Sequence, residues 1–483
     1  MKNVIILRLG EITIKSKKVR KMFENILLRN INRALASEGL TGYKIRKEGG
    51  RIFVYVSEAE NEKAINVLRR VFGITSLSHA YECYTKSLNE ILQIGERLFK
   101  DKVKGKKFAV RARRVGAHDF TSLDVEKELG STLLPYSEGV DLVNPDVTVF
   151  VEIRDDRAYF FDNIVRCYGG LPIGVEGKVV ALVSGGYDSI VAAWFLMKRG
   201  AEVHYVFCNL GGAIHEAGAL SVIKVLADKW SYGYEPLVYV VDFREILSEI
   251  RRKCDPSLIT IILKRFMYRV AEEVAEKIGA EAIVTGESLG QVSSQTLRNL
   301  YVSSLAIRMP ILRPLIGLDK EEIVSLAREI GTYDASSKVR EYCGAFSEHP
   351  KTHSELNEVL KEEAKIDMKI YNRVLESLRI LKIREISITC PKGLEIEIMP
   401  RDALIIDLGS GAKLKEKELN LIKMSFDELL EKSDKLDRNK TYILVCDQGG
   451  LSLEAAKILR DLGLNAYSLR GGYKSLRKYK EKS

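Results

Sequence analysis

Four short apolar segments in the middle of the chain, separated by helical stretches, constrain the fold more than any other feature. They are VVALV (179–183), VHYVFC (203–208), LVYVVDF (237–243) and AIVTG (282–286). Continuous apolar runs of this length are typical of strands buried on both faces of a parallel sheet, and helices connect such strands. We therefore predict a doubly wound α/β domain over residues 173–390.

The sequence on either side of this region predicts further domains, because 483 residues exceed what one hydrophobic core supports. Residues 1–75 are expected to form strand, helix, two strands, helix and strand, which is the order of a ferredoxin-like domain. A second α+β segment follows over residues 76–168. Residues 354–382 are expected to form a charged helical stretch at the end of the central domain, and a smaller α/β pattern covers residues 391–483. We predict four domains with these boundaries.

Composition excludes several classes of protein. With 46% hydrophobic and 29% charged residues, the chain is too apolar for a disordered protein, yet no apolar run reaches the ~20 residues of a membrane helix. The apolar stretch near the N-terminus is too short for a secretory signal. Seven cysteines and six histidines are scattered without a CxxC pair, which argues against a zinc module or a disulfide framework. We expect a cytoplasmic protein with no metal site made by a side-chain cluster.

A basic segment lies in the second predicted domain. Residues 100–114 hold eight basic residues and one acidic residue, within a chain of net charge +10. Such density favours a polyanionic partner, nucleic acid first, although a solvated lysine face is the alternative. The candidate contacts are Lys102, Lys104, Lys106, Lys107, Arg111, Arg113 and Arg114.

A glycine-containing string, Ser184-Gly185-Gly186-Tyr187-Asp188-Ser189, joins the first apolar strand to a helix. Glycines let the backbone approach an anion, and the loop amides and the helix N-terminus together bind phosphate. The hydroxyls of Ser184 and Ser189 are additional donors, and Asp188 is placed to cap the helix or to face Mg²⁺. No Lys-Ser/Thr pair follows, so the string is not a Walker A loop. The alternative is an ordinary strand-to-helix turn.

Cys446 is the second chemical candidate. It ends the apolar strand YILVC (442–446) and opens a loop that leads into the helix 453–462. Loop amides at a helix N-terminus favour an anionic sulfur, whether thiolate or persulfide. The alternative is a buried apolar cysteine at a strand end.

The string SGGYDS resembles the PP-loop of ATP pyrophosphatases, which cleave ATP between the α and β phosphates and adenylate a substrate. Further blocks resemble the ThiI family of tRNA 4-thiouridine synthetases in the same order along essentially the whole chain. They include GEITIKS (10–16), NLGGAIHE (209–216), TGESLGQVSSQT (285–296), ILRPLIGLDKEEI (311–323) and EYCG (341–344).

This resemblance gives the four predicted domains their character. It implies a ferredoxin-like domain (1–75), a THUMP RNA-binding domain (76–168), a PP-loop ATP pyrophosphatase domain (173–390) and a rhodanese-like domain (391–483). The basic segment falls inside the part that resembles THUMP, where contacts to tRNA phosphates are expected.

The resemblance also implies an ATP pocket, with Mg²⁺ accompanying the nucleotide. Read on their own, Lys264 could be a surface lysine and Gln295 an ordinary loop amide. The implied ATP-binding residues are Leu182, Val183, Ser184, Gly185, Gly186, Asp188, Ser189, Phe207, Cys208, Lys264, Gly286 and Gln295.

For sulfur, the resemblance implies that a cysteine desulfurase loads Cys446 with persulfide sulfur, so that no stable prosthetic group is needed. Cys343, in EYCG, would form a disulfide with Cys446 during turnover, and a cellular thiol reductant would clear it. Asp188 would act with these cysteines as the third catalytic residue. The expected product is 4-thiouridine at position 8 of tRNA, made by a homodimer.

Three alternatives remain at this point. One is a sulfur carrier for the thiazole of thiamine, working with a sulfur carrier protein of that pathway. Another is a different PP-loop ligase, such as an amidotransferase-like synthetase, although no N-terminal nucleophilic cysteine is visible. The third is a tRNA-binding protein without activity, against which the intact SGGYDS string and both cysteines argue.

Overall fold

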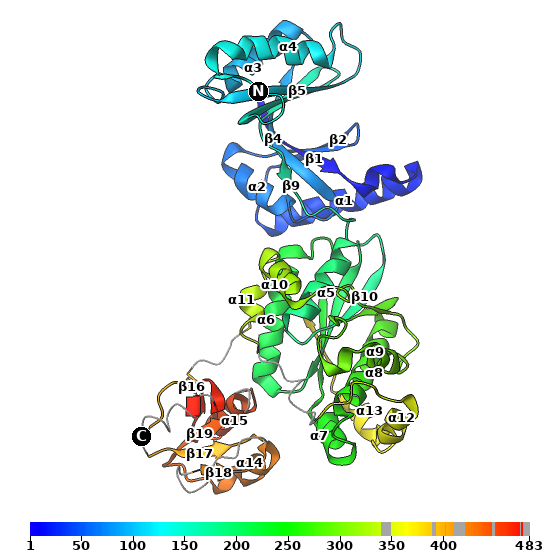
Figure 1. Ribbon diagram of the computed structural model, residues 1–483, viewed down its shortest axis with the longest axis vertical. Coiled ribbons are helices and arrows are strands. Elements are labelled where there is room, and N and C mark those ends of the chain that lie inside the picture. The colour runs from blue at the N-terminus through cyan, green and yellow to red at the C-terminus, as the bar shows by residue number, and fades with distance from the viewer. Residues whose placement is uncertain are drawn as a thin grey trace. The chain divides into compact units, whose positions relative to one another are not determined.

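The structure is a computed structural model that describes residues 1–339, 349–388, 393–400, 402–409, 421–446, 450–473 and 475–476. The chain divides into two compact units. The first comprises residues 1–175 and 198–200, and the second comprises residues 176–197 and 201–483 (Figure 1). Among the helices of the described residues, none combines the length and apolar character needed to cross a membrane.

The first unit is built on one mixed sheet of nine strands. Its strands are β1 (Lys2–Leu9), β2 (Lys44–Glu48), β3 (Arg51–Tyr55), β4 (Ile74–Tyr84), β5 (Lys107–Val115), β6 (Gly139–Val140), β7 (Val147–Arg154), β8 (Arg157–Phe161) and β9 (Val165–Arg166). They lie in the order β2-β3-β1-β4-β8-β7-β5-β6, and β9 pairs with β4. The helices are α1 (Lys17–Ser37), α2 (Asn61–Leu68), α3 (Leu88–Phe99) and α4 (Ser122–Leu133).

Strand β4 joins the two segments that the sequence suggested for this unit. Its 11 residues pair with β1 of the ferredoxin-like segment on one side and with β8 of the second segment on the other. The predicted ferredoxin-like order of elements is confirmed, and its sheet continues without a break into the second segment.

The second unit begins with a six-stranded sheet in the order β14-β13-β10-β11-β12-β15. The strands are β10 (Lys178–Leu182), β11 (Glu202–Asn209), β12 (Leu237–Asp242), β13 (Ala282–Val284), β14 (Ile311–Leu312) and β15 (Arg379–Lys382). The first five are parallel, and β15 runs antiparallel to β12 at the edge. Helices connect the parallel strands, so the predicted doubly wound sheet is confirmed.

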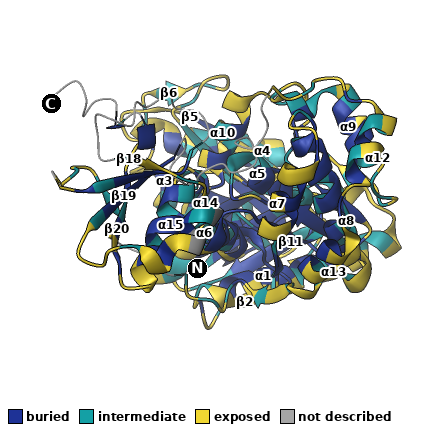
Figure 2. Cartoon of the chain, turned by 90° about the horizontal axis from the view of Figure 1, so that it is seen from below, coloured by how far each residue is buried: buried dark blue, intermediate teal, exposed yellow. Residues whose placement is uncertain are grey.

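The helices of this part are amphipathic or buried according to their place around the sheet. They are α5 (Tyr187–Lys198), α6 (Gly212–Trp230), α7 (Arg244–Lys253), α8 (Ile259–Ile278), α9 (Leu297–Ser304), α10 (Lys320–Glu329), α11 (Tyr333–Ser336), α12 (Leu356–Glu363) and α13 (Met368–Glu376). Strand β11 is buried beyond its first residue, and Ile262 and Phe266 of α8 belong to the core that covers the sheet (Figure 2). Central strands buried in this way explain their continuous apolar sequence.

A third sheet, also in the second unit, is smaller and wholly parallel. It has the order β16-β20-β19-β17-β18, with two helices described beside it. Its elements are β16 (Glu395–Ile396), β17 (Leu404–Asp407), β18 (Leu421–Lys423), α14 (Phe426–Lys432), β19 (Thr441–Val445), α15 (Gly450–Asp461) and β20 (Asn465–Leu469). Leu444 of β19 and Leu459 of α15 pack in one core cluster, as the predicted α/β pattern requires.

Candidate active site

The candidate active site lies at the edge of the six-stranded sheet where its parallel strands end. Strand β10 is paired with β11 on one side and with β13 on the other, and β14 lies beyond β13. Because parallel strands end at the same edge of a sheet, the segments that follow them converge there. These segments contain most of the residues that the sequence assigned to ATP.

The loop after β10 packs too tightly for a side chain at Gly185. Gly185 has a φ of +82°, and a Cβ at this position would lie 2.9 Å from Ala219 Cα and 3.0 Å from Val339 Cγ1. Both the conformation and the space therefore require glycine. Ser184 N donates a hydrogen bond to Ser189 Oγ at 3.3 Å, so the two serines hold the loop closed on itself.

Asp188 is held from two sides by groups that the sequence did not single out. Lys320 Nζ, from the first turn of α10, lies 2.8 and 3.1 Å from the two carboxylate oxygens. Gln291 Nε2 donates to the same carboxylate at 3.0 Å. Lys320 lies in the ILRPLIGLDKEEI block (311–323), one of the blocks that carry the family resemblance, but the resemblance assigned no role to Lys320 itself.

The segment after β13 lies directly against the loop. A Cβ on Gly286 would come within 2.4 Å of Asp188 C and Ser189 N, so only glycine allows this approach. Two predicted ATP residues stabilise the surroundings: Gln295 Oε1 accepts a hydrogen bond from Ser288 N at 3.3 Å, and Lys264 lies 2.8 Å from Glu287. The structure thus places Gly286 against the loop, and Lys264 pairs with Glu287, the residue that follows Gly286.

The end of β11 contributes buried side chains. Phe207 and Cys208 are 0% and 6% exposed, so a nucleotide at this edge would meet their backbone. His215, on α6, packs its ring 4.8 Å from the Phe207 ring and hydrogen-bonds the Ser184 backbone. Burial lowers the pKa of His215 to about 4, against the opposing effect of that hydrogen bond. A neutral histidine therefore supports the first residue of the loop, a role that sequence reasoning did not assign.

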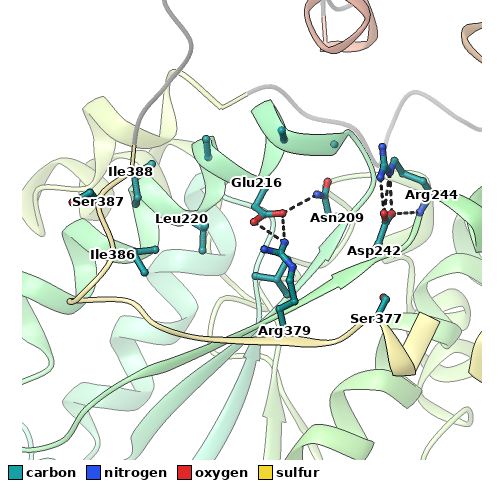
Figure 3. Close-up of a pocket in the computed structure, with 14 residues that line it drawn as sticks. Asn209, Glu216, Leu220, Asp242, Arg244, Ser377, Arg379, Ile386, Ser387 and Ile388 are labelled. Atoms are coloured by element: carbon teal, nitrogen blue, oxygen red, sulfur yellow. Dashed lines mark hydrogen bonds and ion pairs between the residues drawn. The ribbon is translucent and has the colours of Figure 1, made fainter. Parts of the chain in front are cut away.

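A separate cavity of about 610 Å³ opens at the carboxyl ends of β11 and β12, beside α6 (Figure 3). Glu216 accepts from Asn209 at 3.2 Å and pairs with Arg379 at 2.6 Å. Asp242 pairs with Arg244 at 2.6 Å. The four charges are thus paired with one another, and none of the predicted site residues lines this cavity.

Cys446 follows β19 and is 4% exposed. Ser452 N, in the first turn of α15, donates to Cys446 Sγ at 3.4 Å, and Ser452 Oγ lies at the same distance from the sulfur. Ser452 Oγ is in turn 2.8 Å from Ser468 Oγ. The sulfur therefore lies near the N-terminus of α15, against an amide and a hydroxyl of Ser452. The loop residues 447–449, whose amides the sequence placed around the sulfur, lie outside the described residues.

Cys343, the predicted partner of Cys446, lies outside the described residues. The described chain before it ends at Val339, whose side chain contacts Gly185 in the loop and Gly218 on α6. The last described residue before Cys343 therefore lies beside the loop 184–189. Among the described residues, no group of three or more His, Cys, Asp or Glu side chains is arranged to hold a metal ion.

The basic segment of the first unit presents much of its charge to solvent. Lys107, Arg111 and Arg113 alternate along β5 with less exposed neighbours. Arg113 also lies close enough to Arg8 that its charge lowers the pKa of that guanidinium, an effect smaller than that of burial. Lys102, Lys104 and Lys106 precede the strand in an exposed loop. The surface is basic, and its use for RNA remains a prediction.

Four family models match successive parts of the chain. A model described as "ThiI ferredoxin-like domain" matches residues 4–78, and one described as "THUMP domain" matches residues 85–161. A model described as "Thiamine biosynthesis protein (ThiI)" matches residues 174–368, and a "Rhodanese-like domain" model matches residues 403–479. The predicted fold class and the resemblance are confirmed.

Similar proteins cover most of the chain. A tRNA sulfurtransferase of Pyrobaculum aerophilum is 43% identical over 477 residues, which are 97% of this chain and 96% of that protein. A probable tRNA sulfurtransferase of Saccharolobus islandicus is 46% identical over 382 residues, 79% of this chain and 100% of the relative. A crystal structure of a 4-thiouridine synthetase–RNA complex with bound ATP matches with a TM-score of 0.70 and 31% identity. That match covers 79% of this chain and 99% of the other.

Proposed function

This chain belongs to the ThiI family of tRNA sulfurtransferases, and from that premise we propose that it makes 4-thiouridine in tRNA by an ATP-dependent sulfur transfer. The observation that carries the proposal is the edge around Asp188. This edge combines a tight glycine loop, a helix N-terminus and the cations Lys320 and Lys264. The chain that carries it is 31% identical to a 4-thiouridine synthetase solved with RNA and ATP. Such an edge suits a polyphosphate.

The first proposed step activates uracil. The C4 oxygen of the uridine attacks the α-phosphorus of ATP, the bond to the β-phosphate breaks, and pyrophosphate leaves. The backbone amides of residues 184–189 and the N-terminus of α5 would stabilise the departing charge. Uracil C4 then carries AMP, which is a better leaving group than the original oxygen.

Mg²⁺ would be bound mainly by the phosphates of ATP, where it neutralises charge. The exposed fraction of the Asp188 side chain, 21%, and its position at the loop fit a carboxylate that meets this ion. In the structure the same carboxylate is bound by Lys320, which would then be available to a phosphate oxygen.

The second proposed step moves the sulfur. A cysteine desulfurase loads Cys446 with a persulfide, and the terminal sulfur attacks C4 while AMP leaves. Cys343 then attacks the Cys446 sulfur, which frees the thiolated base and forms a Cys343–Cys446 disulfide; a thiol reductant restores both cysteines. If Cys343 attacks first, it releases sulfide for the same reaction at C4. The desulfurase, the reductant and a homodimer remain predictions.

The tRNA would be held by the first unit. The basic side chains on and before β5 are exposed, and phosphate contacts of this kind fix the position of RNA without reading its sequence. The THUMP family model matches the residues that contain them.

A second candidate function is sulfur delivery for the thiazole of thiamine. The description of the matching family model, "Thiamine biosynthesis protein (ThiI)", supports it, and the rhodanese-like part with Cys446 would suffice. ATP chemistry at Asp188 is not needed for this role, so the two functions separate by mutation.

The experiment mixes purified protein with unmodified tRNA, Mg-ATP, a cysteine desulfurase, cysteine and a thiol reductant, and measures 4-thiouridine in the digested tRNA by mass spectrometry. Wild type is expected to form product, whereas Asp188→Ala is expected to bind tRNA but form none. Cys446→Ala is expected to lose desulfurase-dependent product. Absence of product with a folded wild type that binds tRNA would refute the proposal.

A further inference from the structure

A buried carboxylate beside the loop collects two cations. Glu287 follows β13 and is 5% exposed. Its Oε1 accepts from Lys264 Nζ at 2.8 Å, and its Oε2 accepts from Arg313 Nε at 2.7 Å. Tyr268 Oη and Thr285 Oγ1 donate to the same Oε2, at 2.9 and 3.0 Å. A single carboxylate thus organises side chains from α8 and from the ends of β13 and β14.

The cluster carries one positive charge in excess. Burial by itself would raise the pKa of Glu287, but Lys264 and Arg313 outweigh it and hold the pKa at about 2, so the carboxylate is ionised at neutral pH. One negative charge therefore faces two cations. The side chains of Lys264 and Arg313 are 20% and 17% exposed, against 6% for Glu287. The two cations are thus more exposed than the carboxylate, so an anionic ligand would meet them before it meets Glu287.

The cluster is adjacent to the loop that receives phosphate. Gly286, the neighbour of Glu287, is the residue whose Cβ would collide with Ser189 N. Arg313 directly follows β14, and Thr285 N donates to Leu312 O at 3.1 Å, which aligns the ends of β13 and β14. Strands in a sheet lie about 4.8 Å apart, so β14 is about 10 Å from β10, whose end carries the loop. A triphosphate bound at the loop would bridge this distance together with the extended side chain of Arg313.

We propose that Arg313 is a phosphate-binding residue of the nucleotide site and that Glu287 is the positioning residue that presents Arg313 and Lys264 to the phosphates. The proposal rests on the proposed use of ATP. The sequence resemblance assigned Lys264 but neither of the other two. The Arg313 guanidinium has five N–H donors, and contacts to Glu287, Ser304 and Tyr268 fix its plane while leaving further donors for phosphate.

The competing explanation is a structural clamp, in which Glu287 only ties α8 and the ends of two strands together. The two explanations differ in how the effect of a mutation depends on the number of phosphates. Loss of a phosphate contact weakens ATP more than AMP, whereas loosening of the whole pocket weakens both alike.

The test is calorimetric binding of Mg-ATP, Mg-ADP and AMP to the full-length chain. Arg313→Gln is expected to weaken ATP binding about tenfold to a hundredfold, as loss of a hydrogen bond between charged groups does, with a smaller effect on ADP and little on AMP. Arg313→Lys should recover part of the loss. Arg308→Gln is the matched control, because Arg308 is exposed just before β14, at its opposite end.

Glu287→Gln supplies a test of opposite sign. Removal of a negative charge near a polyanion would, by Coulomb attraction alone, tighten ATP binding. A positioning residue predicts weaker binding, because the two cations lose their common acceptor. Thermal unfolding of each variant, followed by tryptophan fluorescence, confirms that the protein is folded.

The outcomes separate cleanly. If wild type binds ATP but Arg313→Gln binds ATP as tightly, or loses ATP and AMP equally, the assignment of Arg313 is overturned. Tighter or unchanged ATP binding by Glu287→Gln overturns the positioning role. If wild type does not bind ATP, the proposed function itself fails rather than this inference alone.

Discussion

Two strand-to-helix connections in the second unit start from the same kind of strand and end at the same kind of helix terminus, but the side chains around them differ. Residues 183–186 connect β10 to α5, and Cys446 opens the connection from β19 to α15. Both follow a buried parallel strand and lead into a helix N-terminus, an arrangement that favours negative charge. Around the first loop lie Lys320, Lys264 and Arg313, whereas the described contacts of Cys446 come from Ser452.

The difference shows what a helix N-terminus does and does not decide. It favours an anion at either loop, but the side chains around it select which anion. A polyphosphate carries several charges and requires cations from neighbouring elements, which α8, α10 and the end of β14 supply. A single sulfur atom requires fewer partners, and the amide and the hydroxyl of Ser452 contact Cys446.

The largest expected effect comes from closing the space behind the phosphate loop. Gly286→Ala would place a Cβ 2.4 Å from Ser189 N and push the loop out of position. We expect ATP binding to weaken by about a hundredfold or more, since a displacement of 1 Å in a site has effects of this order. Calorimetry with Mg-ATP measures it.

The control for this change is Gly317→Ala, because a Cβ at Gly317 meets nothing within 4 Å and its φ is unrestrictive. Alkylation of Cys446 should be unchanged in both variants. If Gly286→Ala bound ATP like wild type, the close packing of the two segments would have no part in nucleotide binding.

The next effect tests the cations around the first loop. Lys320→Ala removes the partner of Asp188 on α10, and we expect the rate of 4-thiouridine formation at saturating tRNA to fall about thirtyfold. Glu321→Gln, an exposed neighbour on the same helix, serves as the control. A variant with normal thiolation would show that the contrast in charge between the two loops is incidental.

The fold was largely predictable because local signals coincide with it. Each buried strand of the six-stranded sheet up to β13 is a short apolar run, and glycines follow β10, β11 and β13. Strand β15 is the exception. The sequence of 354–382 predicted a charged helical stretch, but residues 379–382 pair with β12 at the sheet edge. Because β15 lies at the sheet edge and Ile380 is 59% exposed, the strand has no alternating apolar pattern that would predict it. Its strand conformation results from pairing with β12 in the folded structure.

The site was predictable only where it is contiguous in sequence. The loop 184–189 and Cys446 are recognised from residues that stand together in a strand-to-helix context. Glu287, Arg313 and Lys320 were inside recognised blocks but received no role, because charge pairs between segments of different strands and helices arise only on folding. Gln295 was assigned to ATP, and the structure shows it accepting a hydrogen bond within its own loop.

The third prediction uses pH to separate the two loops. His215 supports the phosphate loop, and burial lowers its pKa from 6.5 to about 4; burial does the same for His204. The unfolded chain therefore binds protons between pH 6.5 and 4 that the folded chain does not, so stability is lost as pH falls through this window. Above this pH window, each histidine would contribute as much as about 3 kcal/mol to the free energy of unfolding.

Tryptophan fluorescence measures this loss selectively. Trp194 on α5 and Trp230 on α6 are the two tryptophans of the chain, and both belong to the part with the phosphate loop. The denaturant midpoint of the wild type should fall as the pH is lowered from 6.5 to 4. In His215→Gln the midpoint should fall only by about the amount that His204 causes. An unchanged slope in that variant would mean that His215 is not the neutral support inferred from its burial.

The smallest effect concerns Cys446, which the amide and the hydroxyl of Ser452 contact. Ser452→Ala removes the hydroxyl 3.4 Å from Cys446 Sγ but keeps the backbone N–H. We expect alkylation of Cys446 by iodoacetamide at pH 7, followed by peptide mass spectrometry, to slow about fivefold, as loss of one hydrogen bond does. ATP binding should not change.

Ser468→Ala is the matched variant for this last change. Ser468 Oγ contacts Ser452 Oγ at 2.8 Å, so it affects the sulfur only through Ser452, and its removal should slow alkylation less than Ser452→Ala does. Equal effects of the two variants would mean that the hydroxyls of Ser452 and Ser468 act as a pair on the rate of alkylation of Cys446. If neither variant changed the rate of alkylation, the backbone amide of Ser452 and the N-terminus of α15 would be the groups that stabilise the sulfur. The contrast between the two connections would then rest on the cations that surround the first.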